Sequence, residues 1–169
     1  MGHSSDDSFS VYDIESGAKS WGPLRVHNTS AANYAFSADG KSIVSIGEDG
    51  LVCILDVSAG SILHCFPSGQ PGSLFGLTVS PNGQAVATSG NDGAVRIWRV
   101  TTGERIGQAI ASHASAMWRL EFSALGDRFV SGGHDARVIF WDGGTGSQTG
   151  NAPVVHSTRV DFVSFLNEA

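Results

Sequence analysis

The chain has 169 residues and a net charge of −6 at pH 7, and it is 41% hydrophobic but only 15% charged. This length suits one ordinary domain with enough apolar material for a core. The sequence contains no apolar run of the length, about 18 residues, that would span a membrane. Its ten basic residues are scattered rather than clustered, so direct DNA or RNA binding is not expected either.

From the N-terminus onward, the chain consists of short strand patterns separated by turns rich in Gly, Asn, Asp and Ser. The expected strands are Ser8–Asp13, Ala18–Leu24, Tyr34–Phe36, Ile43–Gly47, Leu51–Asp56, Ser61–Phe66, Leu74–Val79, Gln84–Ser89, Ala94–Arg99, Glu104–Ile110, Met117–Phe122, Asp127–Gly132, Arg137–Asp142, Ser147–Ala152 and Val154–Leu166. Short strands at this spacing, joined by glycine turns, predict meandering antiparallel sheets.

The strand pattern repeats with a constant period of 43 residues. The residue types that recur at this step are Asp13, Asp56 and Asp142; Asp6, Asp49, Asp92 and Asp135; Ser37, Ser80 and Ser123; and His27, His113 and His156, with Gln70 at the remaining histidine step. A period of this size indicates a solenoid, propeller or array. One unit cannot bury its apolar face alone, so neighbouring units must stack, and function lies on the surface that the stack creates.

The dipeptides that close the third strand of each unit identify a family. They are Trp141-Asp142, Trp98-Arg99 and the weaker Tyr12-Asp13 and Leu55-Asp56. With four strands in a unit of about 40–45 residues, this pattern resembles the WD-repeat β-propellers, over essentially the whole chain. The resemblance implies an all-β fold, a β-propeller of four-stranded antiparallel blades.

The period divides the chain into four blade-equivalents within a single domain, residues 1–169. Three blades cover about residues 27–69, 70–112 and 113–153, and one blade is split between 154–169 and 1–26. A split blade leaves open strand edges that favour pairing with another chain. We expect a homo-oligomer, a head-to-tail dimer of eight blades. Two alternatives stay open: the chain belongs to a longer or divided propeller, or it closes a four-bladed ring by itself.

The resemblance also implies a structural tetrad in the third unit, formed by His113, Ser131, Asp135 and Trp141. In this tetrad the aspartate orients the histidine, the histidine reaches the hydroxyl, and the hydroxyl reaches the indole N–H. The other units lack one member each. Gln70 replaces the histidine in the second unit, Leu55 replaces the tryptophan in the first, and Gly2 replaces the hydroxyl in the split one. We therefore expect those blades to be less stiff.

No catalytic, cofactor-binding or metal-binding residues are predicted. Three of the six histidines occupy equivalent positions one blade apart, which is too far for a shared zinc ion. The segment Ala35–Ser42 formally matches a phosphate-binding loop, but it is a recurring turn that no helix can follow. Because no ring of acids or metal ligands recurs either, we expect a protein that is not an enzyme and carries no cofactor.

The two cysteines are expected to be unpaired. If Asp56 and Ser61 flank the hairpin turn, Cys53 lies opposite His64, and Cys65 points to the other face of the sheet. Two free thiols fit a reducing compartment. The first seven residues lack the basic start and apolar stretch of a signal peptide. Together these features predict an intracellular protein, cytoplasmic or nuclear.

The surface most often used by the family for partners is the narrow face, where the loops before the first strands meet the turns after the second strands. Its positions here are Ser30, Ala32, Glu48, Ser73, Phe75, Asn91, Ala116, Trp118, His134, Arg159, Asp161 and Ser5. The partner-binding candidates among them are Trp118, Phe75, Arg159, His134, Asp161, Glu48 and Asn91. We expect a scaffold that binds a protein or peptide there. The alternative function is a self-assembling repeat module, engineered, reconstructed or cut from a longer propeller, whose main property is ring closure.

Overall fold

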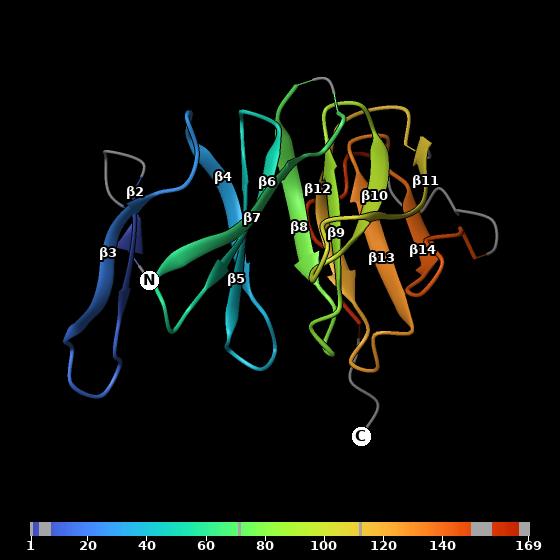
Figure 1. Cartoon of the computed structure of the whole chain (residues 1–169). Helices are drawn as coiled ribbons and strands as arrows, with labels where there is room; N and C mark the ends of the chain where they lie inside the picture. Colours follow the sequence, from blue (N-terminus) through green and yellow to red (C-terminus); the bar gives the residue numbers. More distant parts are fainter. Residues whose placement is uncertain (1, 4–7, 71, 112, 150–156, 166–169) are drawn as a thin grey trace.

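The computed structural model describes residues 2–3, 8–70, 72–111, 113–149 and 157–165. In this part of the chain all regular elements are β-strands, arranged as a row of separate sheets (Figure 1). None of the described elements is a helix long and apolar enough to cross a membrane. The all-β class expected from the repeat is therefore confirmed.

The strands form four antiparallel sheets in chain order. The first sheet holds β1 (Gly2–His3), β2 (Ser8–Tyr12) and β3 (Lys19–Arg25); the second β4 (Ala31–Phe36), β5 (Ser42–Gly47), β6 (Leu51–Asp56) and β7 (Ser61–Pro67); the third β8 (Leu74–Val79), β9 (Ala85–Gly90), β10 (Ala94–Arg99) and β11 (Arg105–Ala111); and the fourth β12 (Met117–Phe122), β13 (Arg128–Gly133) and β14 (Val138–Asp142). The expected fourth strand Ser147–Ala152 is reduced, in its described part, to a bridge between Trp141 and Gln148.

Recurring aspartates shape the turns between the third and fourth strands. The Asp56 carboxylate accepts hydrogen bonds from the backbone N–H groups of Ser58 and Ala59 at 2.7 and 2.8 Å. Asp142 accepts equivalent bonds 86 residues later, from Gly144 and Thr145. The bonds from the hydroxyl of Ser58 and the backbone N–H of Ala59 lower the pKa of Asp56. The 43-residue spacing of these aspartates is therefore the spacing of one turn type.

The apolar core lies between the sheets rather than within any one of them. Ala87 and Ile97 of the third sheet pack with Phe122, Phe129 and Trp141 of the fourth. Corresponding clusters join the second sheet to the third and the first sheet to the second. Full burial of a side chain of this size contributes about 1.5–3 kcal/mol. Each blade therefore depends on its neighbours for most of its stability.

The two ends of the row of sheets carry the two parts of the split blade (Figure 1). At one end, the Trp21 indole N–H donates to the Val57 carbonyl at 2.6 Å and holds β3 against the second sheet. At the other end, residues 157–165 lie along β12, with Val160 4% exposed and its N–H bonded to the Gly133 carbonyl at 3.0 Å. Among the residues that the structure describes, the two parts of the split blade therefore lie at opposite ends of the row and share no strand pairing (Figure 1).

The expected first strand of the split blade, Val154–Leu166, is wrong in its described part. Residues 157–165 have no strand assignment, and the rest of that range lies outside the described residues. The segment nevertheless takes the place of a first strand. Asn33 donates to the Phe75 carbonyl at 3.2 Å, and Arg119, 86 positions later, donates to the Asp161 carbonyl at 3.0 Å. No second strand lies beside this segment in the described structure, so it lacks the ladder that would make it a strand.

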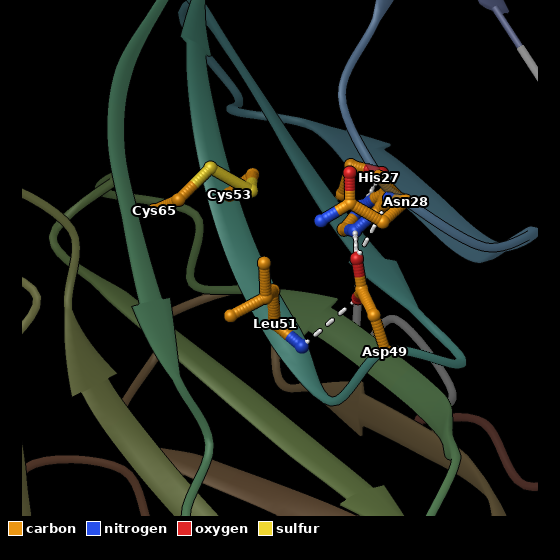
Figure 2. Close-up of a disulfide and its surroundings, with 7 residues drawn as sticks. His27, Asn28, Asp49, Leu51, Cys53 and Cys65 are labelled. Carbon is orange, nitrogen blue, oxygen red and sulfur yellow. Dashed lines mark hydrogen bonds and ion pairs between the residues drawn. A yellow bond between two sulfur atoms is a disulfide. The ribbon is translucent and has the colours of Figure 1, made fainter.

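The expectation of two free thiols is also wrong, because Cys53 and Cys65 form a disulfide across β6 and β7, with a Cα–Cα distance of 4.2 Å (Figure 2). The hairpin does begin with Asp56 opposite Ser61. A bulge then shifts the register between Ile54 and Leu55, so that Cys65 faces Cys53. A regular ladder was assumed from the sequence, and one extra residue in β7 reverses which side chains share a face. The two cysteines therefore do not support a reducing compartment.

The tetrad residues of the fourth sheet form one continuous chain of hydrogen bonds. The His113 Nδ1 lies 2.7 Å from the Asp135 carboxylate, and its Nε2 lies 2.9 Å from the Ser131 hydroxyl. The Trp141 indole N–H donates to the same hydroxyl at 2.9 Å. Asp135 also accepts the Ala114 N–H at 2.9 Å. The network thus ties the loop before β12 to β13, β14 and the turn between them.

The second sheet repeats this network without its last member. His27 reaches the Ser45 hydroxyl at 2.8 Å. It also reaches Asp49 at 3.0 Å, and Asp49 accepts the Asn28 N–H at 3.0 Å (Figure 2). Leu55 is fully buried where Trp141 stands in the fourth sheet, and it offers no N–H to the serine. The hydroxyl therefore has one partner fewer than Ser131.

The third sheet replaces the missing histidine with an arginine that the sequence analysis overlooked. Arg96 is 7% exposed, and it donates to the Gln70 side-chain carbonyl at 3.1 Å and to the Asp92 carboxylate at 2.7 Å. Trp98 donates separately to Thr88 at 2.9 Å. A buried guanidinium therefore links the aspartate to Gln70, the residue at the histidine position, and the bond between Trp98 and Thr88 forms a separate part of the network.

Burial is the largest influence on His113 and lowers the pKa of its imidazole, although the neighbouring Asp135 acts in the opposite direction. Burial also opposes ionisation of Asp135. The hydrogen bonds from His113 and from the Ala114 and Arg137 backbone outweigh that effect, and the pKa of Asp135 is lowered. At neutral pH the pair is thus a neutral imidazole donating to a carboxylate.

One turn of the fourth sheet departs from the glycine rule of the others. Ala136 has a φ of 65°, and its equivalents Gly50 and Gly93 have φ values of 74° and 67°. A side chain with a Cβ in this left-handed region costs about 1–2 kcal/mol. Ala136 is therefore a point of backbone strain beside the tetrad aspartate.

We predict that Ala136→Gly leaves stability unchanged or raises it by up to about 1 kcal/mol, since relief of strain exceeds the gain in unfolded-chain entropy. The reverse change Gly93→Ala should destabilise, because a Cβ there would also collide with the His113 carbonyl. Urea denaturation of both variants measures the difference. A clear loss of stability in Ala136→Gly would contradict the strain argument.

We predict that Asp135→Ala costs more stability than Asp49→Ala. Removal of Asp135 frees a histidine whose hydroxyl partner also holds Trp141, and we expect a loss of about 2–4 kcal/mol against about 1–2 kcal/mol for Asp49. Thermal unfolding followed by near-ultraviolet circular dichroism measures both. Equal shifts in melting temperature would show that the indole link adds nothing.

We predict that stability falls as the pH drops below neutrality. The folded pKa of His113 lies below its ordinary value of 6.5, so the unfolded chain takes up a proton first, and this stability is lost as pH falls through about 6.5. The lowered pKa of Asp135 acts in the same direction at lower pH, because its stabilisation is present above the ordinary pKa of 3.8 and lost as pH falls below it.

Urea denaturation from pH 7.5 to pH 5 tests this, with a slope from one such group of at most about 1.4 kcal/mol per pH unit. The variant His113→Gln has glutamine at the position equivalent to Gln70. It should be less stable than the wild type at pH 7.5, and its free energy of unfolding should fall less steeply with pH. An unchanged slope in that variant would exclude His113 as the source.

Candidate functional site

The narrow face is built from a recurring hydrogen bond between two loops of each blade. The Glu48 N–H donates to the Ser30 carbonyl at 3.1 Å, and the Asn91 N–H donates to the Ser73 carbonyl at 3.4 Å. The third copy joins the His134 N–H to the Ala116 carbonyl at 3.2 Å. Each bond ties the turn after the second strand to the start of the first strand. The positions predicted to bind a partner are therefore held by the backbone, not by mobile loops.

The buried aspartate networks hold the same turns through hydrogen bonds to their backbone. His134 lies directly before Asp135, whose carboxylate also accepts the Arg137 N–H at 3.2 Å. In the second sheet, Glu48 lies directly before Asp49, which accepts the Leu51 N–H at 3.1 Å. The buried network thus fixes the backbone on which the exposed residues Glu48 and His134 stand.

Phe75 and Trp118 stand at equivalent β-bulges. The register of β8 and β9 shifts between Leu74 and Gly76, and that of β12 and β13 shifts between Met117 and Arg119. A bulge leaves one residue outside the regular pairing and changes the direction of its side chain. Phe75 is half-buried, whereas the side chain of Trp118 and all of Ser5 lie outside the described structure.

Three predicted residues meet in one pocket of about 250 Å3, lined by His134, Arg159, Asp161 and Arg119. Arg159 Nε lies 2.8 Å from the Asp161 carboxylate, and Arg119 Nε donates to the Asp161 backbone carbonyl at 3.0 Å. The Arg159 and Asp161 side chains are 61% and 69% exposed, so this ion pair is largely hydrated and contributes little to stability. The pocket lies between the fourth sheet and residues 157–165.

The remaining predicted residues are not part of this pocket. Glu48 and Asn91 are exposed on the second and third sheets at the steps equivalent to His134. Arg119 was missed in the sequence analysis, because its equivalents Asn33 and Gly76 gave no sign of a charged position. The signal available in the sequence for Arg119 was its position on the first strand of this blade, beside the predicted partner-binding positions Trp118 and Arg159.

A second hollow, of about 300 Å3, opens on the opposite face between the third and fourth sheets. Its lining residues are Ser80, Asn82, Gln84, Ala85, Arg99, Ile106, Leu125, Gly126, Asp127, Gly143 and Gly144. These are mostly turn residues, and they present no set of nucleophile, base and acid. Among the residues that the structure describes, no three His, Cys, Asp or Glu side chains gather in a way that would bind a metal ion.

Comparison with known proteins supports this architecture. The family model "WD domain, G-beta repeat" matches residues 60–99 and 105–142. No curated protein gives a significant match to the sequence. Similar solved structures include those titled "Structure of U3-55K" and "Crystal structure of RRP9 WD40 repeats", each with a TM-score of 0.74 and 20% sequence identity.

Each of these comparisons covers 94% of this chain but only 45% of the other chain, so the chain spans less than half the length of the structures it resembles. At 20% identity they establish the fold alone. The matched repeats, the four antiparallel sheets and the neighbouring folds agree with one another. Residues 60–99 and 105–142 carry the WD repeat, and the chain has the fold of a WD-repeat β-propeller with four-stranded antiparallel blades.

Proposed function

We propose that this chain is a non-enzymatic scaffold that binds a protein or peptide on its narrow face. The observation that carries the proposal is the recurring loop bond, which holds Glu48, Asn91 and His134 at equivalent backbone positions. A partner that docks on a preformed surface loses less free energy to ordering of the receptor. The turns are held by buried tetrad residues, so their rigidity is part of the fold.

The residue types on this face suit a protein partner. Trp118, Phe75 and Arg159 belong to classes that are enriched at interface hot spots or cores. Asp161, Glu48, Asn91 and His134 supply a mixed polar rim around them. A peptide that crosses the face would place apolar side chains near the bulge residues and charged ones near the rim.

We predict that the double variant Trp118→Ala/Arg159→Ala loses its partners. Cross-linking of the purified chain in a cell extract, followed by mass spectrometry, compares the variant with the wild-type chain. We expect enrichment to fall at least about tenfold, since two hot-spot losses exceed about 2 kcal/mol.

Leu125→Ser is the matched control, because Leu125 is 85% exposed and lines the hollow on the opposite face. It should retain the partners. If the double variant and the control capture the same proteins equally, the narrow face is not the binding surface.

A second candidate function, ring assembly, is favoured by the unpaired ends of the row of sheets. Tyr34 and Phe36 of β4 remain 38% and 45% exposed, whereas Leu120 and Phe122, their equivalents in β12, are 9% and 6% exposed. At the other end, Phe162 is 73% exposed. A second copy would place its residues 157–165 beside the first sheet and cover aromatic groups at both seams.

If two chains assemble into a ring, we predict a solution mass of about twice the single-chain value of 17.6 kDa. Light scattering after size-exclusion chromatography measures it. Phe36→Glu/Phe162→Glu should give the single-chain mass, and Ile14→Glu, at a 99% exposed turn position, should not. A wild-type chain that runs as a monomer would exclude self-assembly and leave further blades of a longer propeller as the occupants of both ends.

A further inference from the structure

We propose that the pocket formed by Arg119, His134, Arg159 and Asp161 binds a single anionic group, a phosphate or a carboxylate, on the partner. The inference rests on the proposed function, because it names the chemistry by which one part of the narrow face recognises its partner. The pocket is open to solvent and, at about 250 Å3, has room for such a group.

The charge balance of the pocket is the first reason. The chain as a whole carries a net charge of −6, yet this pocket gathers two guanidinium groups and an imidazole around one carboxylate. Local positive charge on an acidic protein is not needed for solubility, and it attracts anions over the distance of a Debye length.

The use of hydrogen-bond donors is the second reason. An arginine side chain has five N–H donors. Arg119 uses its Nε on the Asp161 carbonyl, and Arg159 uses its Nε on the Asp161 carboxylate. Within the described part of the chain, the Nη groups of Arg119 and Arg159 have no protein acceptor. Their outer edges therefore remain available for the oxygens of a ligand, the geometry in which guanidinium groups bind phosphate and carboxylate most strongly.

The weakness of the existing ion pair is the third reason. Because Arg159 and Asp161 are 61% and 69% exposed, water already competes for their contact. An incoming anion can add to Arg159 without breaking a buried interaction. By contrast, the backbone around the pocket is fixed by the bonds from the Val160 N–H to Gly133 and from the His134 N–H to Ala116. The donor side chains are therefore exposed, whereas the backbone that carries them is held by hydrogen bonds.

The repeat itself shows that the fold does not require this set. The residues equivalent to Arg119 are Asn33 and Gly76, and those equivalent to His134 are Glu48 and Asn91. The second and third sheets make the same loop bonds without any arginine at these steps. A structural role common to all blades therefore does not explain the basic cluster, whereas a ligand at this blade does.

Titration of the isotopically labelled full chain with O-phosphoserine and N-acetylglutamate tests the proposal by nuclear magnetic resonance. The arginine Nε–H signals and the amide signals of residues 132–134 and 159–161 report on the pocket. We expect saturable shifts, with affinity reduced about tenfold in Arg119→Gln and in Arg159→Gln, as expected when one charge-assisted contact is lost. Arg128→Gln is the control, because Arg128 is exposed and lies outside the pocket.

The two probes separate the sources of the anion. Tighter binding of phosphoserine assigns the pocket to a phosphorylated side chain, and equal binding assigns it to any acidic side chain. The proposal is overturned if neither probe gives saturable shifts, or if the two pocket variants bind as the wild type does.

Failure of this inference is distinguishable from failure of the proposed function. If Trp118→Ala loses the cross-linked partners while the pocket binds neither probe, the face binds a partner without an anionic anchor. If Trp118→Ala and Arg119→Gln both retain the partners, the proposed function itself fails.

Discussion

Face-to-face packing of neighbouring sheets is the constraint on which this structure depends. A single four-stranded sheet here has apolar residues on both faces, as the buried Ile97 on one face and the buried Val86 on the other show, and it has no described helix to cover either face. Stacking is the only arrangement among the described elements that removes both faces from water. The same requirement explains why Tyr34 and Phe36 of β4, which face the incomplete first sheet, are partly exposed, whereas their equivalents in β12 are buried.

The polar networks show how much variation that packing tolerates. Trp141 is held by a complete chain from Asp135 through His113 to Ser131. The third sheet holds Gln70 and Asp92 with Arg96, although the Arg96 Nε has no hydrogen-bond partner in the described structure, and the second sheet ends its network at a buried leucine. Each of these three sheets thus carries a buried polar network at the same place, but the residues of the network and its completeness differ from sheet to sheet.

The turns of the narrow face share one backbone arrangement but carry different side chains. The backbone bonds that position Glu48, Asn91 and His134 are the same in three blades, whereas the side chains they present differ in charge and size. A repeat architecture thereby places unlike groups at like positions. The pocket beside the fourth sheet illustrates this, because it combines a recurring loop bond with residues from the segment 157–165, which follows no strand ladder.

The sequence by itself determined the strand content, the period and the order of the blades, because these depend on local turn chemistry and on alternation within short segments. Asp56 and Asp142 shape their turns by accepting the backbone N–H two residues later, so these turns do not depend on distant contacts. Tertiary structure decided the pairing of Cys53 with Cys65, since a single bulge residue changes the register and no local signal marks it. It also decided the role of Arg96 and the meeting of Arg119 with Asp161, because these contacts join residues 26 and 42 positions apart. Contacts of that range depend on how the sheets stack, which a periodic pattern implies but does not specify in detail.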